Sequence, residues 1–271
     1  MLHAFTCRYS RRAFGWCVPI GALAGLIGLG GGEFRLPVLM HSMSFAARTA
    51  IPINLSVSMI TLLFALAVRG RAVSLFDVLP HGPEVLGLAL GGMVTAFYGA
   101  PLVKRLTGER LMQIIAVLLA ALGVLLCLEA LYPFAALEIV PAEQSARLAL
   151  GCVIGAGIGI VSSVLGVAGG ELLIPTLMFV FGADIVTAGS ASILISLCLI
   201  SAGLWSYWRI GAFPRGRGIQ RIAASMSFGS IIGAAIGGLA IAVAPTEALK
   251  LLLGVVLIGA AAKVLLAEHS S

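Results

Sequence analysis

The residues in this chain that are best suited to chemistry lie in two similar glycine-rich elements. Residues 28–39 read GLGGGEFRLPVL and residues 166–177 read GVAGGELLIPTL, with six of the twelve positions identical. A helix breaks most easily at glycine and proline, and a break in apolar surroundings must turn its freed backbone N–H and C=O groups toward protein, water or a ligand. These elements therefore predict a binding site. Its expected backbone positions are Gly30, Gly31, Gly32 and Pro37 in the first element and Gly169, Gly170 and Pro175 in the second.

The chemistry expected at such breaks is the binding of an anion. A half-helix that begins near residue 33 directs its N–H groups and the positive end of its dipole inward. Two such ends form an anion site that needs no cation. Glycines can also serve only to let helices pack closely. We expect this simpler role for Gly21, Gly25, Gly87, Gly91, Gly155, Gly159, Gly229, Gly233 and Gly237.

Each element also carries a glutamate, Glu33 or Glu171, at the equivalent position. A carboxylate inside a membrane is costly and indicates a function by default. Two roles stay open: an interfacial helix cap that faces water and is stabilised by the dipole, or a proton carrier. A glutamate beside an anion is best accommodated when protonated, so both are candidate proton-coupling groups. Arg35 can pair with Glu33, but Leu173 stands at the equivalent position, which excludes a symmetric role for Arg35.

Small polar residues follow each element. In lipid such side chains either bond back to helical carbonyls or line a path for a solute. The two sets are Thr49, Asn54, Ser56 and Ser58 in the first half and Thr187, Ser190, Ser192 and Ser196 in the second. The expected substrate site includes Asn54, Ser56, Ser190 and Ser192.

The composition places these elements in a membrane. Of 271 residues, 60% are hydrophobic and only 10% are charged, against about 25% charged residues in a soluble domain. An ordinary soluble enzyme, a disordered chain and a disulfide-rich secreted module are thereby excluded, and a polytopic helical membrane protein remains. The 17 Lys and Arg outnumber the 11 Asp and Glu. They lie in short gaps between apolar runs and form no basic stripe, so we expect no nucleic-acid partner.

The apolar runs predict an all-α fold. A bilayer core of about 30 Å needs about 20 helical residues, and eight hydrophobic segments are long enough once the lysines that flank the last one extend to the interface. They are 13–32, 49–68, 85–103, 111–128, 148–170, 185–208, 222–246 and 251–262. Two shorter runs, 36–47 and 172–183, each follow a glycine element and predict half-helices.

The likeness of the two elements extends along the chain. The offset of 138 residues that relates Gly28 to Gly166 also pairs Ser58 with Ser196 without a gap. A duplicated unit is how many secondary transporters are built, with the site at the interface of the repeats. The expected division is a tail at 1–12, a first membrane repeat at 13–128, a polar linker at 129–147, a second repeat at 148–267 and a tail at 268–271.

The membrane topology stays open between two arrangements. If only the eight long segments cross, the repeats are parallel, whereas ten crossings that include the short runs make the repeats inverted. The split of lysine and arginine between the two sides does not decide between them. Both arrangements place both termini in the cytoplasm.

At these residues the sequence resembles the sulfite exporter TauE/SafE family, whose halves each open with a GxGGGxxxxP motif. Residues 28–37 fit this motif fully, and residues 166–175 fit it except that Ala168 replaces one glycine. The resemblance implies a multi-pass protein of the inner (cytoplasmic) cell membrane that transports small anions such as sulfite or sulfonates, driven by the proton gradient. Many members carry an apolar residue where Glu33 and Glu171 stand.

Two other classes of function are weighed against transport. An intramembrane enzyme needs a nucleophile, base or metal set, but the histidines and cysteines form no ligand pattern and lie outside the repeated elements. We therefore expect no catalytic residues, no metal site and no cofactor. A non-transporting membrane scaffold is the other alternative. The expected partners are a small anionic substrate and the lipid bilayer, and the oligomeric state stays open, with a homodimer as one option.

Overall fold

The structure is a computed structural model that describes residues 2–43, 45–72, 75–106, 109–131, 143–214 and 216–268, and these residues form helices and connecting turns with no strand. The helices are α1 (Leu2–Ile27), α2 (Gly32–Pro37), α3 (Ala47–Ala72), α4 (Gly82–Leu106), α5 (Glu109–Leu131), α6 (Gln144–Leu165), α7 (Gly170–Phe179), α8 (Ile185–Arg209), α9 (Arg217–Ala240) and α10 (Thr246–Glu268), with a π-helical turn η1 (Val38–Ser42) and a 3₁₀ segment η2 (Leu75–His81). Nine of the ten predicted apolar runs each correspond to one α-helix, whereas the run 36–47 begins at the end of α2, continues through the π-helical turn η1 and ends at the first residue of α3.

The all-helical prediction is confirmed, but the predicted eight long hydrophobic segments are not confirmed. Within the described residues, four helices are long and apolar enough to cross a membrane. They lie in α3, α6, α8 and α9. Most of the predicted polar linker at 129–147 falls outside the described residues, as does most of the C-terminal tail.

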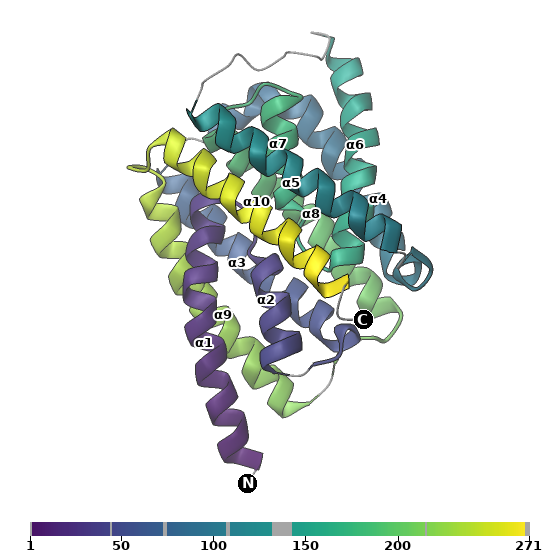
Figure 1. Ribbon diagram of the computed structural model, residues 1–271, viewed down its shortest axis with the longest axis vertical. Coiled ribbons are helices and arrows are strands. Elements are labelled where there is room, and N and C mark those ends of the chain that lie inside the picture. The colour runs from purple at the N-terminus through teal and green to yellow at the C-terminus, as the bar shows by residue number, and fades with distance from the viewer. Residues whose placement is uncertain are drawn as a thin grey trace.

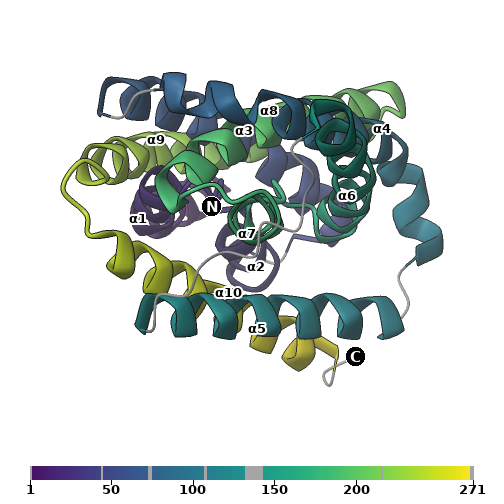
Figure 2. The same cartoon turned by 90° about the horizontal axis from the view of Figure 1, so that it is seen from above.

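The two halves are interlocked rather than placed side by side. The first helix of each half packs against the fourth helix of the other half, so that α1 lies along α9 and α6 lies along α4. The third helices α3 and α8 pack against α9 and α4 respectively, and also against each other. Figure 2 shows the equivalent helices α5 and α10 together along one side of the molecule.

Equivalent helices run in opposite directions. In Figure 1, α1 rises from the N-terminal end at the bottom, whereas α6 descends from the top. Likewise α5 rises toward the upper left while α10 descends toward the lower right. Each half has five helices, an odd number, so the second half begins in the direction opposite to the first. The two halves are therefore arranged as inverted repeats.

The swapped helix pairs approach closely through glycine. A Cβ atom on Gly25 or Gly233 of the α1–α9 pair would overlap a backbone carbonyl oxygen of the facing helix. In the α4–α6 pair the same holds for Gly91 and Gly155, and a Cβ on Gly151 would lie 2.9 Å from the carbonyl oxygen of Glu84. These contacts match the close-packing role expected for the glycine ladders.

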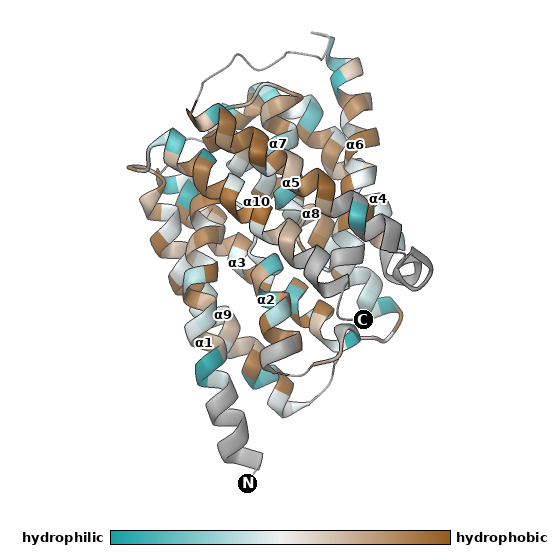
Figure 3. Ribbon diagram, in the orientation of Figure 1, coloured by the Kyte–Doolittle hydropathy of each residue, from teal (hydrophilic) through white to brown (hydrophobic). Residues whose placement is uncertain are grey.

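Large apolar side chains cover much of the outside. Val94, Val153, Phe228 and Leu239 are among the exposed ones, and Figure 3 shows hydrophobic residues along the outward α5 and α10. Polar side chains such as Asn54 are instead buried in the interior. Apolar side chains on the outside and polar side chains in the interior are what a protein surrounded by lipid tails requires.

Candidate functional site

Both glycine elements break the chain, and the breaks lie ahead of the prolines. After α1 the backbone passes through Gly28, Gly30 and Gly31 with φ of 99°, 86° and 69°, values that favour glycine. The second break has Gly166 at 65° and Gly169 at 80°. The prolines do not make the breaks: Pro37 ends α2 and Pro175 lies inside α7. Each proline is the sixth residue of its helix, beyond the first turn, so the carbonyl of Glu33 or Glu171 four residues earlier lacks the backbone donor it would have in a regular helix.

The two breaks lie against each other in the interior. A Cβ atom added to Gly30 would lie 2.8 Å from the Cβ of Ala168, and one added to Gly170 would lie 2.9 Å from the Cα of Leu29. Residues 28–33 and 166–175 are buried throughout. The chain thus brings together two segments that are 138 positions apart, and both carry backbone polar groups released by a helix break.

Asn54 and Ser192, which are equivalent under the offset, bond across this junction. Asn54 Nδ2 donates to the carbonyl of Gly166 at 2.9 Å and to that of Gly32 at 3.1 Å. Ser192 Oγ donates to the carbonyl of Gly28 at 3.3 Å, and Gly28 is the equivalent of Gly166. Each half therefore holds the break of the other half.

Arg35 is fully buried and satisfies the carbonyl groups of its own break. Its Nε donates to the carbonyl of Gly31 at 3.1 Å, one terminal nitrogen donates to the carbonyl of Gly30, and the other to Thr61 Oγ1 at 3.2 Å. The guanidinium thus lies at the break itself rather than in a loop. It neutralises the carbonyl end of the first break.

Arg69 is a site residue that the sequence analysis did not identify, because a base at the end of an apolar run normally marks the membrane surface. It is buried and reaches the last turn of α1, where it donates to the carbonyl of Leu26 at 3.1 Å. It also donates to the carbonyl of Val186 at 2.8 Å and to Ser190 Oγ at 3.0 Å. The repeat gives no signal for it, since Tyr207 and not a base stands at the equivalent position.

The remaining predicted side chains have distinct environments. Glu33 and Glu171 lie in the first turns of α2 and α7 and are 9% and 3% exposed, so neither is a cap that faces water. Ser190 accepts from Arg69 and donates to the carbonyl of Val186. Ser56 donates to the carbonyl of Pro52 within its own helix at 2.7 Å and makes no bond to either break among those described.

Ser58 and Ser196 form the most unusual pair of this region. They are equivalent under the offset, both are fully buried, and neither hydroxyl has a hydrogen-bond partner in the described part of the chain. Several other helical serines bond back to a carbonyl four residues earlier, namely Ser56, Ser190 and Ser201. A buried unpaired hydroxyl costs about 1–3 kcal/mol, so these two groups are available for a ligand.

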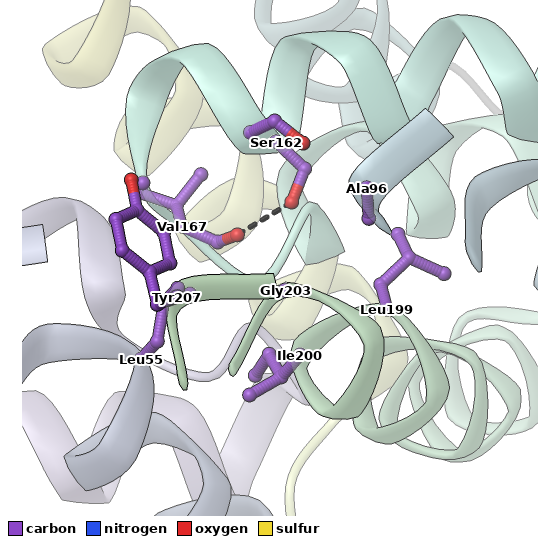
Figure 4. Close-up of a pocket in the computed structure, with 10 residues that line it drawn as sticks. Leu55, Ala96, Ser162, Val167, Leu199, Ile200, Gly203 and Tyr207 are labelled. Atoms are coloured by element: carbon purple, nitrogen blue, oxygen red, sulfur yellow. Dashed lines mark hydrogen bonds between the residues drawn. The ribbon is translucent and has the colours of Figure 1, made fainter. Parts of the chain in front are cut away.

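A cavity lies beside the second break (Figure 4). Its volume is about 20 Å³, which is room for a single water molecule. Ser162, Val167 and Tyr207 line it, and Ser162 Oγ donates to the carbonyl of Val167 at 2.5 Å. Its other walls are mainly apolar, from Leu55, Ala96, Leu199 and Ile200.

Charged pairs occur at one end of the bundle, outside the breaks. The buried carboxylate of Glu84 contacts His81 at 2.8 Å and Arg147 at 3.3 Å. Lys250 contacts Glu129 at 2.7 Å beside a hollow of about 220 Å³. These pairs join helix ends and touch neither break. Among the described residues no group of three or more His, Cys, Asp or Glu side chains is placed to hold a metal ion.

Comparison with known proteins gives one positive result. A family model described as sulfite exporter TauE/SafE matches residues 13–264, which is most of the chain. No curated protein and no solved structure matches the chain.

Proposed function

The chain belongs to the sulfite exporter TauE/SafE family of membrane permeases, and on that premise we propose that it is a secondary transporter of a small sulfur-containing anion such as sulfite or a sulfonate. The family is one of transporters and not of enzymes. The partners implied are a small anion and the lipid bilayer. The substrate enters a site between the two glycine breaks, near the centre of the inverted repeats.

The observation that carries this proposal is the pair of unpaired buried hydroxyls beside two helix breaks. Ser58 Oγ would lie 3.5 Å from a Cβ atom at Gly32, the first residue of α2, and Ser196 occupies the equivalent position in α8. Hydroxyl donors and the N–H groups of the first turn of α7 are suited to the oxygens of an oxyanion. We assign the substrate to this region, with Gly30, Gly31, Gly32, Gly169 and Gly170 supplying the close backbone approach.

Proton coupling by Glu33 and Glu171 is part of the same proposal. Both carboxyl groups lie within the first turn after a break, next to the proposed anion. A charged carboxylate and an anion repel each other strongly at low dielectric. Protonation removes this repulsion, so that binding of the anion favours uptake of a proton, which is the requirement for coupling.

The proposed location is the inner (cytoplasmic) membrane with both termini in the cytoplasm. The opposite directions of equivalent helices support ten membrane segments, including the half-helices, over eight. In that arrangement the two breaks approach the middle of the bilayer from opposite sides.

Counterflow in proteoliposomes tests the proposal. Purified protein is reconstituted and preloaded with sulfite, thiosulfate, a sulfonate or a carboxylate in turn, and exchange with labelled anion is measured. We expect exchange of at least one sulfur anion. Ser58→Ala and Ser196→Ala should each raise KM about tenfold, because a hydrogen bond to a charged group contributes about 1.5–3 kcal/mol.

Ser56→Ala is the matched control, since its hydroxyl is already bonded within α3. It should leave KM unchanged. Absence of exchange with every sulfur anion, from protein that is folded and correctly inserted, would refute the proposed function.

A further inference from the structure

The two halves differ in how the helix before each break is terminated. At the end of α1, Arg69 donates to the carbonyls of Gly25 and Leu26, whereas Arg35 donates to those of Gly30 and Gly31, just before α2. Under the offset, Tyr207 replaces Arg69 and Leu173 replaces Arg35. At position 207, the end of α6 therefore lacks the guanidinium that terminates α1, and the second break lacks the counterpart of Arg35.

The cavity of Figure 4 lies at the end of α6, where the second half has no arginine equivalent to Arg69. It is lined by Ser162, Ser163, Gly166 and Val167 from the end of α6 and by Tyr207. Ser163 is the equivalent of Gly25, whose carbonyl binds Arg69 in the first half. In the second half, the residue at the position equivalent to Arg69 is Tyr207, which lines this cavity and brings no cation to it.

The missing arginine leaves the negative charge at the C-terminal end of α6 without a compensating cation. The C-terminal end of a helix carries roughly half a negative charge, and in the interior of a membrane protein that charge is weakly screened. Arg69 compensates it in the first half. No basic residue lines the cavity in the second half.

We propose that this cavity binds a small inorganic monovalent cation, which supplies to the end of α6 the charge that Arg69 supplies to the end of α1. Its ligands are oxygens of Ser162, Ser163, Gly166, Val167 and Tyr207. Hydroxyl and carbonyl oxygens suit such hard cations. The carbonyl of Gly166 accepts from Asn54 and that of Val167 from Ser162, and each carbonyl has a second lone pair for a cation.

This cation site is separate from the proposed anion site and does not depend on which anion is transported. It lies on the carbonyl side of the second break, whereas the anion is assigned to the N–H side and to Ser58 and Ser196. A cation bound to unwound carbonyls and an anion bound to helix N-termini can occupy one broken helix together.

Thermal unfolding of the purified full-length protein tests the site without any transport assay. The melting temperature is measured in NaCl, KCl and choline chloride at equal ionic strength. We expect it to rise by several degrees in NaCl or KCl and to saturate with concentration, because a ligand that binds only the folded state stabilises it. Choline is too large for the site and should give no rise.

Tyr207→Arg places a tethered cation where the first half has one. The variant should fold, and its melting temperature should be the same in all three salts. Trp208→Arg, at the exposed neighbouring position, is the control and should keep the dependence on the cation. Ser162→Ala provides a second test that keeps the cavity open, and it should shift the saturating cation concentration upward severalfold.

Equal melting temperatures of the wild-type protein in NaCl, KCl and choline chloride over the whole concentration range would overturn the inference. So would a cation dependence that Ser162→Ala and Tyr207→Arg both leave unaltered, because the cation would then bind elsewhere. Neither result depends on whether the protein transports sulfite.

Discussion

Asn54 Nδ2 lies 2.9 Å from the carbonyl oxygen of Gly166, although 112 residues separate the two in the chain. The same amide bonds to the carbonyl of Gly32 at 3.1 Å. One side chain of α3 thus joins the break of its own half to that of the other half. A displacement of one break relative to the other must therefore lengthen or break one of these two hydrogen bonds.

The first prediction concerns this amide. Asn54→Ala removes the partner of two buried carbonyls, which we expect to destabilise the protein by about 2–4 kcal/mol and to reduce anion flux at least tenfold. Ser192→Ala removes one longer bond and should cost less. Melting temperature and flux per inserted protein measure both effects. A wild-type flux for folded Asn54→Ala would show that the bridge has no part in transport.

The second prediction concerns Arg69. Arg69→Met leaves the carbonyls of Leu26 and Val186 without this donor, and several unpaired buried acceptors should cost about 3 kcal/mol or more. Arg69→Lys keeps the charge and should recover part of the loss. Arg71→Met, two residues later and exposed, is the control and should melt like the wild type. A similar loss in both Met variants would mean that burial of Arg69 is not the cause.

The sequence predicts the helices and the pairing of equivalent residues, because both follow from local composition and from one constant offset. It also predicts that the glycine elements are broken. It does not predict that α1 packs on α9 and α6 on α4, since each half alone offers matching glycine ladders and only the assembled bundle decides which helix they face. The orphan hydroxyls of Ser58 and Ser196 are equally unpredictable, because a serine in a helix ordinarily bonds to its own backbone.

The burial of Arg69 could not be predicted from its place in the sequence. A base at the end of an apolar run normally marks the membrane surface. Here α3 continues past it, and the guanidinium turns inward to a helix end that belongs to the same half, beside α8. Only the three-dimensional position of that helix end reveals the partner.

The third prediction tests the close contact between α1 and α9. A Cβ atom at Gly233 would overlap the carbonyl oxygen of Val18, so Gly233→Ala must separate the two helices, at a cost of about 1–3 kcal/mol. Gly259→Ala is the control, because no atom lies within 4 Å of its added Cβ. It should be neutral or stabilising by up to about 1 kcal/mol, since alanine favours a helix. Equal melting temperatures of the two variants would contradict the packing.

The fourth prediction concerns Asp184, which caps α8 outside the span and accepts from the backbone N–H groups of Val186 and Thr187. Burial acts to raise the pKa of Asp184, but the hydrogen bonds from Thr187 and Val186 outweigh it and hold this pKa below its usual value. A lowered folded-state pKa contributes stability above the unfolded pKa of about 3.9, and this stability is lost as pH falls through the folded value.

Asp184→Asn keeps a capping side chain that does not titrate. The wild type should therefore be more stable than Asp184→Asn at pH 6, and the difference should shrink as pH falls below about 4. Melting curves of the pair from pH 6 to pH 3 provide the measurement. Asp184→Ala should lose about 1 kcal/mol at neutral pH. A difference between wild type and Asp184→Asn that grows on acidification would reverse the assigned sign.

The last prediction addresses coupling at Glu33 and Glu171, which are buried beside the two breaks. If each must be protonated when the anion is bound, Glu33→Gln and Glu171→Gln imitate the protonated form permanently. Anion exchange at equal pH on both sides should then persist, because the site stays neutral and its donors are unchanged. Accumulation driven by a pH gradient should disappear, because the side chain no longer gains or loses a proton. Exchange and gradient-driven uptake measured in the same vesicles separate these effects. Retention of full gradient-driven uptake by the double variant would assign the proton to another group.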